Sequence, residues 1–265
     1  MRKGNRLGAF VGQLQSQGRY TFSRDEAIHA LGVSLIAFQA AARRLAGKRR
    51  LVSPRRGFYV IVPPEYSAAG APPPSWFVDD FMKFLEQRYY VGLLTAAALH
   101  GAAHQQPQEF QVVTDFPTRP AAAGRARLRF FVKRELDKTE TVQKKTETGA
   151  MAVSTSEATA LDLVRYADSL GDLTRVARVL AELSEAMQPE ILASLAQREK
   201  TLPLIQRLGY LLEAIGRREH AEPLAQLVAR SRPRQASLNP SAGVEGLQPD
   251  PRWRLYPNEL IEVEE

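Results

Sequence analysis

The sequence predicts an α+β protein in which a small N-terminal domain of helices and one hairpin precedes a mixed domain with a small sheet and a helical C-terminal part. Three observations predict this class. Residues 23–61 carry two helical patterns separated by a glycine and followed by a hairpin pattern, two strand-like segments lie between residues 109 and 132, and residues 173–230 show helical periodicity almost throughout. The length of 265 residues allows about two domains.

The N-terminal pattern marks where each helix begins and ends. Ser23 and Glu26 have the spacing of a capping box and predict a short helix that stops at a turn around Gly32. Ser34 then caps a second helix, and Gly47 is placed to end it. The positions of this helix expected to face the core are Leu35, Phe38, Ala42 and Leu45.

A basic hairpin follows these two helices. Leu51–Ser53 and Phe58–Ile61 have the composition of strands, and the turn between them, residues 54–57, carries two arginines. A further amphipathic helix is expected over residues 7–14, packed beneath the pair. Two helices joined by a tight turn and followed by a hairpin make a winged helix-turn-helix, which inserts its second helix into the major groove of DNA.

The distribution of charge supports a nucleic-acid partner. Residues 1–64 hold twelve Lys and Arg against two acidic residues, a balance of +10, whereas the remainder holds 24 basic and 27 acidic residues, a balance of −3. The whole-chain excess of +7 therefore comes from the first quarter, as expected of a phosphate-binding module. The alternative is that the basic run 48–50 only forms a solvated helix end.

Composition shifts divide the chain into four parts. We expect residues 1–64 to be a winged helix-turn-helix DNA-binding domain and residues 65–75 to be a Pro/Ala-rich linker that is semi-rigid at best. Residues 76–230 form the mixed domain, with the sheet at about 109–153 and helices at about 157–230. Residues 231–265 are expected to be an extended tail.

Within the mixed domain, a helical pattern is expected to run from Trp76 to Leu99. Strands are expected at Glu109–Thr114, Arg125–Val132 and Ala150–Val153. Ser154 and Glu157 have capping-box spacing, so a helix is expected after them. Three prolines sit where helices are expected to begin, namely Pro189, Pro203 and Pro223. A short apolar anchor in the tail consists of Trp253, Leu255 and Tyr256.

The composition also limits the chemistry. The absence of cysteine excludes a disulfide framework, a thiolate metal site and a cysteine nucleophile. No apolar run approaches the roughly 20 residues that span a bilayer, and no secretory signal is evident, so a soluble, cytoplasmic protein without membrane contact is expected. His100 and His104 have the spacing of a metal-binding pair, but a packed or capping histidine is the favoured interpretation, and no metal or cofactor is expected.

No catalytic motif stands out. The chain lacks the Glu-x-Lys and Asp-x-Lys motifs of metal-dependent nucleases, the G-x-S-x-G motif of hydrolases, a Walker loop and a dinucleotide fingerprint. A non-enzymatic protein is therefore expected. Two alternatives stay open: a nuclease or nucleotide-processing enzyme that a winged helix directs to DNA, and a stand-alone transcription factor.

Several segments resemble a known family. YYVGLLTAAALHG (89–101), QPQEFQVVTD (106–115), VSTSEATALDLVRY (153–166) and LGYLLEAIG (208–216) are similar to the AbiEi antitoxins of type IV toxin–antitoxin systems, as is RLVSPRRGFYVIVPPEY (50–66). The resemblance implies a bacterial autorepressor that binds inverted repeats in its own promoter, with a role in abortive infection and phage defence. It also implies that the C-terminal domain counters an AbiEii-like nucleotidyltransferase toxin without a stable complex.

Two sets of residues are candidates for function. Arginines on the second helix are expected to contact either guanine edges or phosphate, alanines beside them either contact thymine methyl groups or permit close approach, and hairpin arginines are expected to meet phosphate or the minor groove. The DNA-binding candidates are Ser34, Ala37, Ala40, Arg43, Arg44, Lys48, Arg49, Arg50, Arg55 and Arg56.

A second basic cluster lies outside the DNA-binding domain and consists of Arg125, Arg127, Arg129, Lys133 and Arg134. Its arginines alternate along a strand, so one sheet face is expected to be basic. One interpretation is an antitoxin surface for RNA, further DNA or the substrate of the toxin. The other is a solvated edge strand that its charges protect from pairing.

Overall fold

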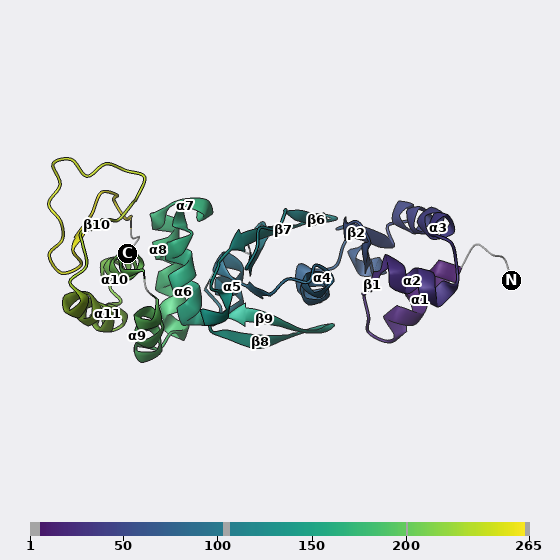
Figure 1. Cartoon of the computed structure of the whole chain (residues 1–265), viewed down its shortest axis with the longest axis horizontal. Coiled ribbons are helices and arrows are strands. Elements are labelled where there is room, and N and C mark those ends of the chain that lie inside the picture. The colour runs from purple at the N-terminus through teal and green to yellow at the C-terminus, as the bar shows by residue number, and fades with distance from the viewer. Residues whose placement is uncertain (1–5, 103–106, 200, 263–265) are drawn as a thin grey trace. The chain divides into compact units, whose positions relative to one another are not determined.

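The computed structural model describes residues 6–102, 107–199 and 201–262 and has the predicted α+β class (Figure 1). The chain forms two compact units. Unit 1 comprises residues 1–91, 108–138 and 142–153, and unit 2 comprises residues 92–107, 139–141 and 154–265. No helix in the described ranges is both long enough and apolar enough to cross a membrane.

The N-terminal part of unit 1 contains the helices and the hairpin that the sequence predicts. The elements are α1 (Arg6–Ser16), β1 (Thr21–Ser23), α2 (Arg24–Leu31), α3 (Leu35–Gly47), β2 (Leu51–Arg55) and β3 (Phe58–Ile61). The three strands form an antiparallel sheet in the order β1-β3-β2. We call residues 6–62 the N-terminal module.

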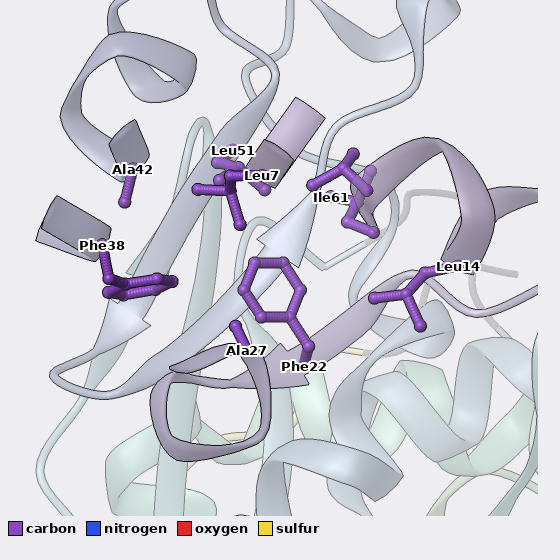
Figure 2. Packing of buried hydrophobic residues seen from close by; sticks show 9 residues of the cluster. Leu7, Leu14, Phe22, Ala27, Phe38, Ala42, Leu51 and Ile61 are labelled. Atoms are coloured by element: carbon purple, nitrogen blue, oxygen red, sulfur yellow. The ribbon is translucent and has the colours of Figure 1, made fainter. Parts of the chain in front are cut away.

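The core of the N-terminal module is apolar and partly aromatic (Figure 2). Leu7 and Leu14 of α1 meet Phe22 of β1 and Phe38 of α3 in one buried cluster. The Tyr59 ring stacks on Phe22 at 5.4 Å and meets Phe38 edge-on at 5.3 Å. These contacts fix which side of α3 faces inward.

The linker expected at residues 65–75 forms neither α-helix nor strand, as predicted, but it is packed against other residues of unit 1. It contains the 3-10 turns η1 (Pro64–Tyr66) and η2 (Pro74–Trp76). The N–H of Arg125 donates to the carbonyl of Ala69 at 2.8 Å. A Cβ on Gly124, whose φ is +54°, would lie 2.3 Å from the same carbonyl oxygen. Only a glycine lets these two backbones approach so closely, so this linker is held against the sheet of unit 1.

The prediction of one helical pattern from Trp76 to Leu99 is wrong. The segment contains α4 (Val78–Phe84), β4 (Tyr89–Val91) and α5 (Leu93–Leu99). Glu86 has a positive φ of 54°, which ends helical geometry, and the aromatic and β-branched residues of β4 suit a buried strand. A short apolar run does not distinguish a buried strand from a helix by periodicity alone.

The larger sheet contains β4 together with β5 (Phe110–Thr114), β6 (Ala121–Ala123), β7 (Ala126–Val132), β8 (Thr141–Thr146) and β9 (Gly149–Ser154). Its order is β6-β7-β5-β4-β9-β8. β5 pairs antiparallel with β4 and parallel with β7, and β9 pairs parallel with β4. The three strands expected between residues 109 and 153 are confirmed, whereas β4 and β6 were not predicted as strands.

Unit 2 is mainly helical. Its elements after α5 are α6 (Ser156–Arg165), α7 (Ala167–Leu170), α8 (Leu173–Leu183), α9 (Pro189–Arg198), α10 (Leu202–Ala214) and α11 (Arg218–Ser231). Pro189 and Pro203 lie in the first turns of α9 and α10, as predicted. Pro223 lies inside α11, so the predicted helix start there is wrong. The carbonyl that loses its N–H partner belongs to Glu219, an exposed residue.

The C-terminal tail is anchored more firmly than an extended surface segment. A parallel pair joins β10 (Ala236–Ser237) to β11 (Leu255–Tyr256). Trp253 has no exposed surface, and its backbone carbonyl accepts a 3.0 Å hydrogen bond from the side-chain amide of Gln206 on α10. The apolar anchor predicted around Trp253 is therefore part of the core of unit 2.

Candidate nucleic-acid interface

The turn between α2 and α3 is built by local caps. The N–H of Glu26 donates to Ser23 Oγ at 3.1 Å, and the Glu26 carboxylate accepts from the Ser23 N–H, which completes the predicted capping box. Gly32 adopts the left-handed conformation, with a φ of 58°. Ser34 then begins α3 because its Oγ accepts from the Ala37 N–H at 3.3 Å.

Packing presents one side of α3 to solvent. Phe38 and Ala42 are buried, whereas Leu35, which the sequence places in the core, is 42% exposed because it lies in the first turn at the margin of the module. Burial raises the pKa of the Tyr59 phenol above its ordinary value, which keeps this packing partner of Phe38 neutral.

The candidate positions on and after α3 are all exposed: Ser34, Ala37, Ala40, Arg43, Arg44, Lys48, Arg49 and Arg50. The five basic side chains among them form no ion pair within the described residues. The structure therefore brings small side chains near the start of α3 together with unpaired cations near its end, on a surface that the core does not use. We call this set of eight residues the α3 surface.

The hairpin presents its two arginines differently. Arg56 is exposed. Arg55 lies beside a β-bulge, and its guanidinium donates to the carbonyl of Arg119, in the loop before β6, at 2.7 Å. Arg55 thus helps to hold the hairpin against the rest of unit 1, which leaves Arg56 as the hairpin arginine without such a contact in the described residues.

The second basic cluster is less uniform than its spacing predicts. On β7, Arg127 bonds the carbonyl of Gly124 at 3.0 Å, while Arg129 lies 3.6 Å from Glu109 and 4.9 Å over the Phe131 ring. Arg125 and Arg134 are exposed and lie outside the strand, and Lys133 is half-buried just after it. β7 lies between β6 and β5 in the sheet, and β6 pairs with its residues 126–128, so the edge-strand interpretation is wrong for that part of β7.

The histidines and carboxylates of the family-like segments have structural partners. His100 stands at the C-cap position of α5, and its Nε2 lies 2.7 Å from the Ser154 carbonyl oxygen, as expected of a packed or capping histidine. His104 lies outside the described residues. Within the described ranges, no group of three His, Asp or Glu side chains is arranged to hold a metal ion.

The predicted cap at Ser154 is shifted by one residue. Thr155 caps α6 by accepting from the Ala158 N–H, while Ser154 Oγ lies 2.7 Å from Thr159 Oγ1. The buried Glu157 carboxylate instead accepts the Gln188 N–H at 2.9 Å, at the start of α9. The local sequence allows either Ser154 or Thr155 to cap the helix. Only the bond between Glu157 and the start of α9, which is distant in the sequence, decides between these two residues.

One feature of α3, the exposure of Ile36, was not predicted from the sequence. Ile36 is 79% exposed, the highest value for a large apolar side chain in the described part of unit 1. The signal was present in the sequence, because Ile36 does not share the helical face of Phe38 and Ala42.

Comparison with known proteins identifies a matching family and a solved structure with a similar fold. Residues 90–214 match the family described as AbiEi antitoxin C-terminal domain. The match supports the role of an antitoxin in a toxin–antitoxin system, as the resemblance predicts. The matched stretch is just under half of the chain, and it supports an antitoxin of the AbiEi family.

Among solved structures, the crystal structure of the RV2827C protein from Mycobacterium tuberculosis is similar, with a TM-score of 0.67 and 16% sequence identity. The similarity covers 94% of this chain and 90% of that chain. At this identity the comparison shows a shared fold alone. No curated protein matches the chain.

Proposed function

We propose that this protein is an antitoxin that also binds DNA through a winged helix-turn-helix in its N-terminal module and represses its own operon at inverted repeats. The α3 surface is the observation that carries the proposal. It combines an exposed helix, side chains small enough for close approach at its start, and a run of unpaired cations at its end. Duplex DNA offers a major groove of helix width flanked by phosphates.

The geometry suggests different roles for the two arginines of α3. Arg43 lies on the side of the helix away from Phe38, where a side chain can reach a base edge in the groove. Arg44 lines a pocket of about 250 Å³ beside Arg6 and Leu31. We propose that Arg43 contacts bases and that Arg44 contacts the phosphate backbone, together with the exposed Arg56 of the hairpin.

We propose that the protein counters an AbiEii-like nucleotidyltransferase toxin without forming a stable complex with it. The family match at residues 90–214 supports the antitoxin role. Two equivalent half-sites of an inverted repeat suit two protomers side by side. The second basic cluster around β7 remains a proposed antitoxin surface.

Binding of the purified protein to a labelled duplex from the region upstream of its own reading frame tests the DNA-binding half. We expect Arg43→Ala to weaken binding to this duplex by about tenfold, in line with a loss of about 1–3 kcal/mol for one base-reading arginine, and to affect random DNA much less. Arg44→Ala should weaken both and reduce the salt dependence by about one phosphate contact. Arg230→Ala, which removes an exposed arginine from the last turn of α11, is the matched control. Equal affinity of the unaltered protein for both duplexes at moderate salt would refute the proposal.

Co-expression with the neighbouring toxin gene tests the antitoxin half. Both genes should be placed under separate inducible promoters, so that loss of repression does not change the amount of antitoxin. We expect the Arg43→Ala variant to rescue growth as well as the unaltered chain does. Failure of the unaltered chain to rescue growth would refute the antitoxin proposal while leaving DNA binding untouched.

A further inference from the structure

The exposed isoleucine of α3 has no role in the fold. Ile36 is 79% exposed, whereas Phe38 and Ala42, which hold α3 on the core, are almost completely buried. Among the described residues only one large apolar side chain, Leu260, is more exposed, at 81%. A branched apolar side chain held in water gains no stability from its position, so Ile36 is available to a partner outside the chain.

Ile36 stands in a stripe that faces away from the core. Residues spaced by four, seven and eleven lie on the same side of a helix, which places Ile36 in line with Ala40, Arg43 and Gly47. The stripe therefore begins with a branched apolar group, continues with a methyl group, and then presents a cation. Ile36 is the second residue after the N-cap Ser34, in the part of a recognition helix that contacts base edges.

The charge around the stripe identifies the kind of partner. The cations of the α3 surface have no ion pair within the described residues, and residues 1–64 contain only two acidic residues. A protein surface that matched this arrangement would need many carboxylates around one apolar contact. Duplex DNA supplies a dense row of phosphates, and the only apolar group on the floor of its major groove is the C5-methyl of thymine.

We infer that Ile36 is a specificity-determining residue that reads the methyl group of a thymine in each half-site. This inference rests on the proposed DNA binding by α3. Ile36 would bury its exposed branched carbons against the methyl, while Ala40 lets the helix approach and Arg43 contacts the neighbouring base pair. The preferred sequence would then contain a thymine at the base pair nearest the start of α3.

Replacing thymine by uracil tests the inference because uracil lacks only this methyl group. A duplex that the full-length protein prefers would be prepared with uracil at a random subset of thymine positions and separated into bound and free fractions. Mapping uracil in each fraction shows which methyl groups contribute to binding. We expect one position per half-site at which uracil weakens binding about fourfold, the effect of burying one methyl group.

The variants decide whether Ile36 causes this effect. Ile36→Ala should abolish the thymine preference at that position and leave the other positions unchanged, and Ile36→Val should retain it. Because Ile36 is exposed, we expect these variants to fold, which thermal unfolding checks. Leu260→Ala, at an equally exposed isoleucine-sized side chain of unit 2, is the matched control and should keep the uracil pattern of the unaltered protein.

Three outcomes would overturn the inference. If uracil weakens binding of the unaltered protein and of Ile36→Ala equally, the methyl group has another reader. If Ile36→Ala leaves the uracil pattern intact but changes the sedimentation of the free protein, Ile36 contacts a second copy of the chain. If the unaltered protein prefers no duplex at moderate salt, the proposed DNA binding fails together with the inference. In the first two outcomes the protein still binds DNA and only the role of Ile36 is refuted.

Discussion

The strongest stability prediction concerns a glycine inside α10. Gly209 packs against the ring of Trp253, and a Cβ built there would lie 2.0 Å from Cζ3 and 2.2 Å from Cη2 of that ring. Such distances do not occur in folded proteins, and the nearby atoms belong to a rigid ring. In Gly209→Ala the tryptophan must therefore leave its site or α10 must shift.

The magnitude follows from two opposing effects. Losing the packing of a buried tryptophan costs about 3–5 kcal/mol, while alanine in place of glycine in a helix contributes about 1 kcal/mol. We expect the free energy of unfolding of Gly209→Ala to fall by about 2–4 kcal/mol. Gly12→Ala is the matched control, since Gly12 lies inside α1 with no heavy atom within 4 Å of the new Cβ. It should be neutral or stabilising by up to about 1 kcal/mol.

Urea titration followed by tryptophan emission measures the free energy of unfolding and, in the same experiment, reports whether Trp253 is exposed to water. The chain has two tryptophans, and displacement of Trp253 into water should shift the emission of the native state of Gly209→Ala to longer wavelength. Trp253→Phe reports what remains from Trp76. Unchanged stability together with unchanged emission in Gly209→Ala would show that the tail does not pack on α10 as described.

Three further predictions concern a buried carboxylate, a tyrosine and a truncation. Glu157→Ala removes a charged acceptor from the N-terminal backbone of α9 and should cost about 1.5–3 kcal/mol in urea titration, whereas the exposed Glu190→Ala should cost little; equal costs contradict this role. Burial first, and then a nearby carboxylate, raise the pKa of Tyr89, so its contribution is complete below its unfolded pKa of about 10 and is lost as pH rises through the higher folded value. Stability should therefore fall above about pH 10, and less steeply in Tyr89→Phe; identical slopes refute this. A fragment of residues 76–265 should bind a hydrophobic dye, because its part of unit 1 loses the aromatic partners of α4; a fragment with no dye binding contradicts this.

The N-terminal module was predictable because its signals are local. Ser23, Gly32 and Ser34 determine helix ends through hydrogen bonds to residues at most four positions away. The separation of Arg43 from Phe38 on opposite sides of α3 follows from helical spacing alone. The candidate site on α3 could thus be placed almost completely, apart from Ile36, whose exposure was not considered.

The larger sheet was harder to predict because its strands depend on distant partners. Residues 89–91 form a strand only because β5 and β9 pair with them from about 20 and 60 positions later in the chain. The three alanines of β6 have poor strand propensity, and pairing with β7 overrides it. The second basic cluster was therefore placed on a sheet whose order the sequence did not reveal.

The packing of unit 1 bears on how the two proposed activities are connected. The Phe58 ring of β3 lies 5.2 Å from Phe81 of α4, and Thr21 donates to Asp80 of the same helix. The hairpin also bonds the loop before β6 through Arg55. The proposed DNA-binding module therefore shares a compact unit with β5 to β7, strands that lie within the matched antitoxin family region. A substitution that unfolds this sheet should impair DNA binding as well, so the two activities are separable only by surface changes such as those at Arg43 and Ile36. A loss of both activities in a core variant would say nothing about a functional link between them.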